Sequence, residues 1–238
     1  MAGHSKWANI KHRKGKADAI KGKLFSRLTK EIISAVKQGG ADPKANTKLR
    51  MVLHKARSAN LPNESIERNI KKATNVAQAD YSEISYELYG YAGVGMIVEI
   101  MTDNKNRSAS EMRIATNKKG GSIANPGSVA FNFERKGMIQ GKKNVSEEEL
   151  FDLVTEAGAE DFDLEEGFCI ITTASERLFQ VKEALENQGF ICEEAQLQMV
   201  PKTYIECDQA NQRLNLDLIE YLEAIDDVDA VYHNMKLF

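Results

Sequence analysis

The residues with the clearest chemistry are the cations near the start of the chain. Eight basic side chains fall within 18 residues, where Asp18 is the only acidic residue. Clustered cations bind polyanions because each phosphate that they neutralise releases condensed counterions. We therefore expect this segment, called the basic arm below, to bind nucleic acid, and we add Arg27 to the predicted set. The arm consists of Lys6, Lys11, His12, Arg13, Lys14, Lys16, Lys21 and Lys23.

The only tryptophan of the chain, Trp7, lies among these cations. An indole ring beside clustered cations can stack on an unpaired base, which is a contact typical of RNA recognition. The alternative is a solubilising tail in which Trp7 packs on the body of the protein. The neighbouring Ala8 and Ile10 are compatible with such packing.

A second polar segment, Asn104-Lys105-Asn106-Arg107-Ser108, stands at the expected start of a helix. Free backbone N–H groups at a helix N-terminus can hold an anion, so Asn104, Lys105 and Arg107 join the predicted nucleic-acid-binding residues. An ordinary helix cap explains the same residues equally well.

Signals for catalysis are weak. The four histidines include no pair at i, i+4 spacing, and no serine or cysteine stands in a recognisable nucleophile motif. Acidic runs such as Glu147-Glu148-Glu149 could hold a divalent cation, but they lack EF-hand spacing and usually cap helices. We predict no catalytic residue, no metal ligand and no cofactor, and keep an enzyme with a metal site in the acidic cluster as a third hypothesis.

The charges are segregated along the chain. Residues 1–75 hold 18 Lys and Arg against five Asp and Glu, a net charge of +13, and residues 76–140 hold seven of each. Residues 141–238 hold seven basic and 23 acidic residues, a net charge of -16. Because most soluble surfaces mix the two signs, this pattern indicates one end that faces a polyanion and one acidic end.

The first 80 residues predict a helical bundle. A helix is expected from Asp18 to Gln38, ended by Gly39-Gly40, with Leu24, Leu28 and Ile32 in its buried stripe. Asp42-Pro43 is expected to open a second helix that ends near Asn60. A third helix is expected over residues 63–73.

The rest of the chain predicts mixed α and β structure. Strands over 84–89 and 96–101 and a helix over 103–119 come first. The order β-α-β-β-α-β over residues 129–200 is the ferredoxin-like motif, with Ser146 and Glu149 at capping-box spacing. A strand over 203–207, a helix over 211–225 and a strand over 228–232 follow.

The expected fold is therefore α+β with three domains. Residues 1–80 would form the basic arm plus a helical domain, and residues 129–200 an inserted, acidic ferredoxin-like domain. Residues 81–128 and 201–238 would together form a discontinuous central α/β domain.

The setting expected for the protein is the cytoplasm. No stretch approaches the roughly 20 apolar residues of a membrane span, and no apolar region follows the basic N-terminus as in a secretory signal. Cys169, Cys192 and Cys207 form no CxxC pair, which fits a reducing compartment. The expected partner is nucleic acid, not a membrane.

Motifs along the whole chain resemble those of the YebC/PmpR family. The segment GHSKWANIKHRKGKADAIKGKLFSRLTKEI at residues 3–32 is the most specific of them. Others follow in the same order, including Thr102-Asp103-Asn104-Lys105-Asn106-Arg107, Pro126-Gly127-Ser128-Val129 and Val231-Tyr232-His233-Asn234.

The resemblance implies three domains, a cytoplasmic protein and no known catalysis. Relatives have been described as DNA-binding transcriptional regulators, and others, including a mitochondrial one, as translation factors acting on ribosomes. Two functions thus remain open for this chain. It is either a transcriptional regulator that binds duplex DNA or a ribosome-associated factor that binds ribosomal RNA.

Salt dependence tests whether the arm contacts phosphates. Replacing Lys11, Arg13 and Lys14 together by alanine should reduce the slope of log affinity against log salt by about 2–3, because each lost contact removes about 0.9 on duplex DNA. Fluorescence anisotropy at several salt concentrations measures the slope. An unchanged slope would exclude the arm from the binding surface.

Overall fold

The structure, a computed structural model, describes residues 17–74, 80–142, 146–165 and 168–237, with the backbone alone at residues 17–21, 58 and 165. The basic arm before Ala17 therefore lies outside the described residues. The described chain divides into two compact units. The helix–sheet unit comprises residues 17–126 and 208–231, and the ferredoxin-like unit comprises residues 127–207 and 232–237.

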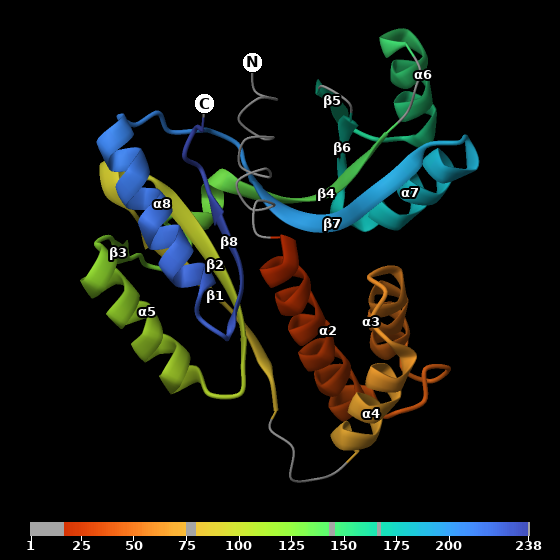
Figure 1. Ribbon diagram of the computed structural model, residues 1–238, viewed down its shortest axis with the longest axis horizontal. Coiled ribbons are helices and arrows are strands. Elements are labelled where there is room, and N and C mark those ends of the chain that lie inside the picture. Colours follow the sequence, from red (N-terminus) through yellow and green to blue (C-terminus); the bar gives the residue numbers. More distant parts are fainter. Residues whose placement is uncertain (1–16, 75–79, 143–145, 166–167, 238) are drawn as a thin grey trace. The chain divides into compact units, whose positions relative to one another are not determined.

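Three helices open the helix–sheet unit (Figure 1). They pack around one apolar cluster that includes Ile32, Leu49 and Ile66, as the helical spacing predicts. Gly40, with a φ of +84°, ends the first helix in the left-handed region that favours glycine. The helices are α2 (Ala17–Gly39), α3 (Thr47–Ser58) and α4 (Asn63–Ala73).

The expected start of the second helix at Asp42-Pro43 is wrong. Those residues form a turn in which the Asp42 carboxylate accepts from the Lys44 N–H, and α3 begins after Asn46. The buried Asn46 side chain accepts from the Leu49 N–H and donates to the carbonyl of Ala35 in α2. Asn46 therefore caps α3 and ties it to α2 at once, a tertiary contact that the local Asp-Pro signal does not reveal.

The buried stripe of α2 is shorter than expected. Leu28 and Ile32 are 3 % and 0 % exposed, but Leu24 is 41 % exposed. The apolar cluster with α3 and α4 reaches back only to the partly buried Phe25. Helical spacing predicts which side of α2 is buried, but where its partner helices stop decides how far the burial extends.

A four-stranded sheet in the order β3-β1-β2-β8 completes the helix–sheet unit, with α5 and α8 side by side next to it (Figure 1). The Asn215 side chain of α8 accepts from the Tyr91 N–H and donates to the Tyr91 carbonyl, which holds the turn between β1 and β2. The elements are β1 (Ser82–Tyr89), β2 (Gly95–Thr102), α5 (Lys105–Lys119), β3 (Ser122–Ile123), α8 (Gln209–Glu223) and β8 (Val228–His233).

Two details of the expected strands are wrong. The short β3 pairs with β1 although no strand was expected there. Residues 203–207 make no regular strand but a single bridge from Ile205 to Met235. The Asn132 side chain explains this, because it accepts from the Thr203 N–H and donates to the Thr203 carbonyl. A side chain thus takes backbone groups that a sheet would pair.

The ferredoxin-like unit has the expected β-α-β-β-α-β order and a sheet in the order β5-β6-β4-β7. The capping box of Ser146 and Glu149 is confirmed, and Gly158, with a φ of +76°, ends the helix that it opens. The α+β fold class is confirmed. The elements are β4 (Phe133–Lys142), α6 (Glu147–Ala157), β5 (Asp161–Glu165), β6 (Phe168–Ala174), α7 (Leu178–Asn187) and β7 (Ile191–Pro201).

Helices α6 and α7 cover one face of this sheet. Leu150 and Leu153 of α6 and Leu178 of α7 pack on Ile139 and Ile171 of the strands. Over the residues that the structure describes, no helix is long and apolar enough to cross a membrane.

The two leucines of α2 provide a matched pair for a stability test. Leu28→Ala should lower the free energy of unfolding by about 2–5 kcal/mol, because it leaves a cavity in the three-helix core. Leu24→Ala should lower it by less than about 1 kcal/mol, because much of that side chain is already in water. Urea unfolding followed by circular dichroism measures both. Equal losses would contradict the described boundary of the core.

Candidate nucleic-acid interface

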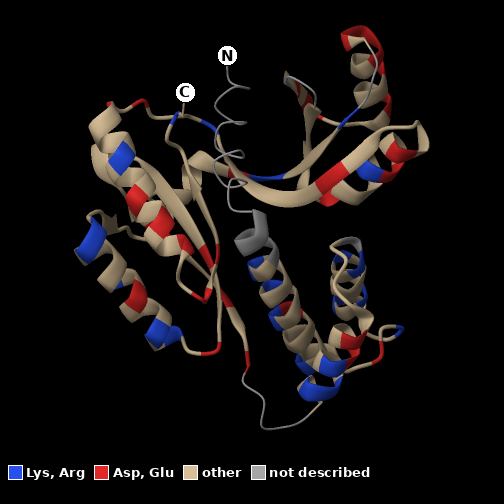
Figure 2. Cartoon of the chain, in the orientation of Figure 1, with Lys and Arg blue, Asp and Glu red and all other residues tan. Residues whose placement is uncertain are grey.

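The largest group of exposed cations among the described residues belongs to α3, α4 and the turn before α3 (Figure 2). Helix α3 has four Lys and Arg residues and no acidic residue. Arg50, His54 and Arg57 stand four and three positions apart, which places them on one side of the helix. We call these cations the α3–α4 basic face. They are Lys44, Lys48, Arg50, Arg57, Arg68, Lys71 and Lys72.

Part of this charge has a role in the helices themselves. Lys55 and Arg57 lie in the last turn of α3, and Lys71 and Lys72 in the last turn of α4. Cations there interact favourably with the helix dipole by a few tenths of a kcal/mol to about 1 kcal/mol. Lys48 and Arg50, at the N-terminal end of α3, have no such role and oppose the dipole. Lys48 donates to the side-chain oxygen of Gln38 and Arg50 to the Thr47 hydroxyl, and both cations remain exposed.

Most of the predicted arm cannot be placed. Lys6, Trp7, Lys11, His12, Arg13, Lys14 and Lys16 lie outside the described residues, as does the side chain of Lys21. The predicted residues that the structure does place are Lys23, Arg27, Asn104, Lys105 and Arg107.

Arg107 belongs to an internal ion-pair network. Its guanidinium lies 2.5 Å from an oxygen of Asp227, the buried carboxylate just before β8, and 2.8 Å from Asp103. Asp227 also accepts from the hydroxyl of Thr102 at 2.9 Å and from Lys30 Nζ at 3.3 Å. These contacts hold Arg107 against the sheet edge.

The electrostatics of this network follow from its partners. Burial opposes ionisation of Asp227, but the hydrogen bonds of Arg107 and Thr102 and the charge of Lys30 outweigh it and lower the pKa of the carboxyl. The hydrogen bonds that Arg107 donates to Asp227 and Asp103 raise the pKa of Arg107. Both groups therefore stay charged at neutral pH.

Arg27 of α2 lies in a second, adjoining network. It pairs with Glu31 at 2.9 Å and also approaches Asp229 of β8 at 3.8 Å and Glu99 of β2 at 4.0 Å. Burial raises the pKa of Asp229 to about 6, although Arg27 and Lys30 favour its ionised form. The structure thus places this predicted residue in a contact between α2 and the sheet.

The loop at residues 104–108 is built as a helix cap. The Asn104 side chain accepts from the N–H groups of Asn106 and Arg107, the groups that an anion would need. Lys105 is exposed beside them. The capping interpretation therefore accounts for Asn104, and nucleic-acid contact by Lys105 stays a prediction.

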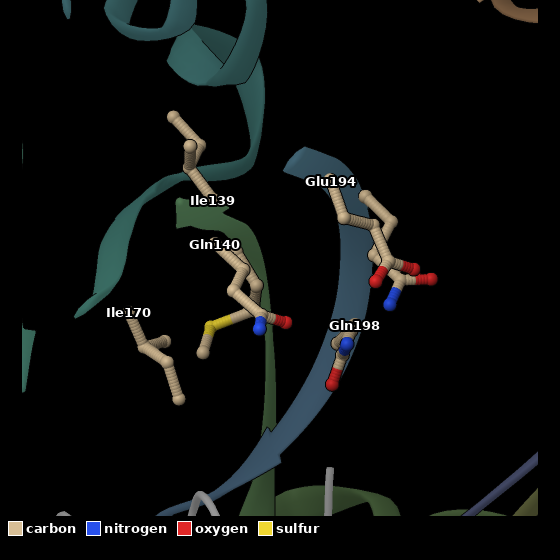
Figure 3. A pocket seen from close by; sticks show the side chains of 7 residues that line it. Ile139, Gln140, Ile170, Glu194 and Gln198 are labelled. Atoms are coloured by element: carbon tan, nitrogen blue, oxygen red, sulfur yellow. The ribbon is translucent and has the colours of Figure 1, made fainter. Parts of the chain in front are cut away.

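Two observations on the described residues bear on the enzyme hypothesis. No group of three or more His, Cys, Asp or Glu residues with metal-binding geometry occurs in the described part of the chain. Figure 3 shows a pocket lined by Met138, Gln140, Ile170 and Glu194 among others, on the sheet of the ferredoxin-like unit. Its volume of about 10 Å³ admits one water molecule.

The sequence-based residue set omits the α3–α4 basic face. The signal was present, since residues 47–58 contain four cations and no acid. Burial is what separates these exposed cations from the paired ones on α2, and burial is not visible in the sequence.

Comparison with known proteins yields matches over nearly the whole chain. A family model described as "TACO1/YebC protein N-terminal domain" matches residues 5–76. A second one, described as "TACO1/YebC second and third domain", matches residues 81–235.

Similar proteins come from several bacteria. A "Probable transcriptional regulatory protein" of Protochlamydia amoebophila is 64 % identical over 100 % of this chain and 97 % of its own length. One from Chlamydia pneumoniae is 58 % identical over 99 % of this chain and all of its own. The crystal structure of a conserved hypothetical protein from Aquifex aeolicus superposes with a TM-score of 0.81 at 42 % identity, covering 98 % of this chain and 97 % of that one.

The raised pKa of Asp229 predicts a pH-dependent stability. The pKa of Asp229 rises from its ordinary value of 3.8 to about 6. Between these two pH values the folded protein keeps a proton on Asp229 that the unfolded chain releases. Stability from this group therefore falls as the pH rises. From pH 4.5 to 7.5 the wild type should lose about 2 kcal/mol that Asp229→Asn does not lose. Urea unfolding at the two pH values measures this difference, and equal losses in both proteins would contradict it.

Proposed function

The chain belongs to the TACO1/YebC family, and from this premise we propose that it is a non-enzymatic cytoplasmic regulator of transcription that binds DNA. The family membership confirms the resemblance seen in the sequence motifs. The regulatory role is supported by the name "Probable transcriptional regulatory protein" that relatives with 64 % and 58 % identity carry.

The observation that carries the DNA-binding step is the α3–α4 basic face. Lys48, Arg50 and Arg57 are exposed on a helix without acidic residues. An α-helix with its side chains is about 10–12 Å across, and the major groove of DNA is about 12 Å wide. Cations on the outer side of α3 can therefore reach phosphates when the helix lies along or in a groove.

The remaining charges fit this assignment. Phosphate contacts by the basic arm would add affinity without sequence preference. The ferredoxin-like unit has exposed carboxylates along α6, including Glu147, Glu148 and Asp152 (Figure 2). These carboxylates repel a polyanion, so this unit is assigned to face solvent or a protein.

Binding of ribosomal RNA by a ribosome-associated translation factor is the second candidate. The feature that favours it is Trp7 among the arm cations, because stacking on unpaired bases suits RNA loops better than a closed duplex. Both candidates require the same exposed cations. They differ in whether unpaired bases are needed.

Substitutions on α3 test the proposal. The variant Lys48→Gln, Arg50→Gln, Arg57→Gln should bind a 24-base-pair duplex more weakly. It should also have a salt slope reduced by about 2–3, since three phosphate contacts are lost. Fluorescence anisotropy between roughly 50 and 200 mM salt measures both quantities.

The matched control removes the same charge elsewhere. Arg113→Gln, Lys118→Gln, Arg213→Gln changes three exposed cations on α5 and α8 and should leave the slope nearly unchanged. An RNA stem-loop measured in parallel separates the two candidate functions, because tighter binding to the loop than to the duplex would favour the ribosomal role. Equal effects of the two triple variants would refute a specific role for α3.

A further inference from the structure

Three cations of α2 lie on one side of the helix. Lys23, Arg27 and Lys30 are four and three residues apart, the spacing of neighbours on a helix surface. All three reach residues 225–229 at the start of β8, and Arg27 and Lys30 also reach β2. A row of cations on α2 therefore meets the edge of the central sheet.

Each cation of this row has an anionic or carbonyl partner. Lys23 Nζ lies 3.3 Å from the carbonyl oxygen of Ile225, and burial lowers the pKa of Lys23. Arg27 pairs with Glu31 of its own helix at 2.9 Å and approaches the carboxylates of Asp229 at 3.8 Å and Glu99 at 4.0 Å. Lys30 pairs with Asp227 at 3.3 Å and donates to the carbonyl of Met101 at 2.9 Å.

The apolar core that the described residues of the three helices form does not extend into the strands of the sheet. Within the described part of the chain, the apolar cluster of α2, α3 and α4 includes Tyr81 from the segment before β1 but no residue of β1, β2 or β8. Ion pairs of this kind contribute little net stability, because desolvation offsets most of their attraction. Separation of α2 from the sheet edge therefore breaks mainly polar contacts, and Asp227 keeps its hydrogen bonds from Arg107 and Thr102 when Lys30 leaves.

The partners have the chemistry of a nucleic-acid backbone. Carboxylate and phosphate oxygens are interchangeable acceptors for Arg and Lys, with similar geometry and charge. Such oxygens are presented to Arg27 and Lys30 of α2 by Glu99, Asp227 and Asp229. The basic arm lies just before these two cations in the sequence.

We propose that Glu99, Asp227 and Asp229 form an autoinhibitory phosphate mimic, which holds Arg27 and Lys30 in the free protein until nucleic-acid phosphates displace it. The inference rests on the proposed nucleic-acid binding and names its regulation. Because nucleic acid must first break the internal contact, the free energy of breaking it makes the binding free energy less favourable by the same amount. By linkage, anything that weakens the internal contact strengthens binding by the same factor.

The first test weakens the mimic. The double variant Asp227→Asn, Asp229→Asn, called the mimic variant below, keeps the shape of both side chains and removes both charges. It should tighten binding to the 24-base-pair duplex about tenfold, the scale of typical couplings between sites, and steepen the salt slope by about 2 as two cations reach phosphates. Circular dichroism and thermal unfolding establish that the variant is folded. If it is not, Asp229→Asn alone takes its place.

A matched control separates release from a simple gain of positive charge. Glu83→Gln, Glu220→Gln removes two exposed carboxylates of the same unit and should change affinity much less than the mimic variant. A gain equal to that of the mimic variant would overturn the proposal, because it would show a long-range charge effect.

A double-mutant cycle identifies the cations that are released. Adding Arg27→Gln and Lys30→Gln to the mimic variant should abolish its gain in affinity for the duplex. The same two substitutions should weaken binding far less when they are made in the wild type. Equal effects in both backgrounds would overturn the proposal. Failure of the proposed function is a different result, namely a wild type that binds neither duplex nor RNA stem-loop at about 50 mM salt.

Discussion

Asp227 accepts hydrogen bonds from Thr102, Lys30 and Arg107 and so joins β2, α2 and α5 at the start of β8. Only 9 % of its side chain is exposed, and a buried carboxylate without partners is costly. The positions of all three partners are therefore constrained together. The N-terminal part of the chain, through α2, depends on a residue near its C-terminal end.

This constraint changes what the uneven charge distribution means. The excess of cations in the first 75 residues suggests a single polyanion-binding end. In the described part of that segment the cations have two different environments. Those on α2, such as Arg27 and Lys30, are paired with the acidic sheet edge, whereas Lys48 and Arg50 on α3 are exposed. Net charge alone does not distinguish the two.

Much of the fold was predictable because its signals are local. The third helix has the expected bounds, residues 63–73, and the capping box at Ser146 lies where its spacing places it. The surroundings of the candidate residues were less predictable. Arg27 and Arg107, which are predicted to bind nucleic acid, also have internal carboxylate partners, and the exposed cations of α3 lie outside the predicted set. Asn104 was compatible with two interpretations, and its side chain acts as a cap.

The α+β class, the family, most helix and strand positions and the concentration of positive charge near the N-terminus are all predictable from the amino-acid sequence. Helical periodicity, caps and glycine stops act between residues that are close in the chain, so they are visible without a structure. Tertiary packing sets the start of α3 after Asn46, the exposure of Leu24 and the choice of cations that carboxylates neutralise. Those outcomes depend on partners such as Ala35 and Asp227, whose proximity arises when distant segments pack and cannot be read from local spacing.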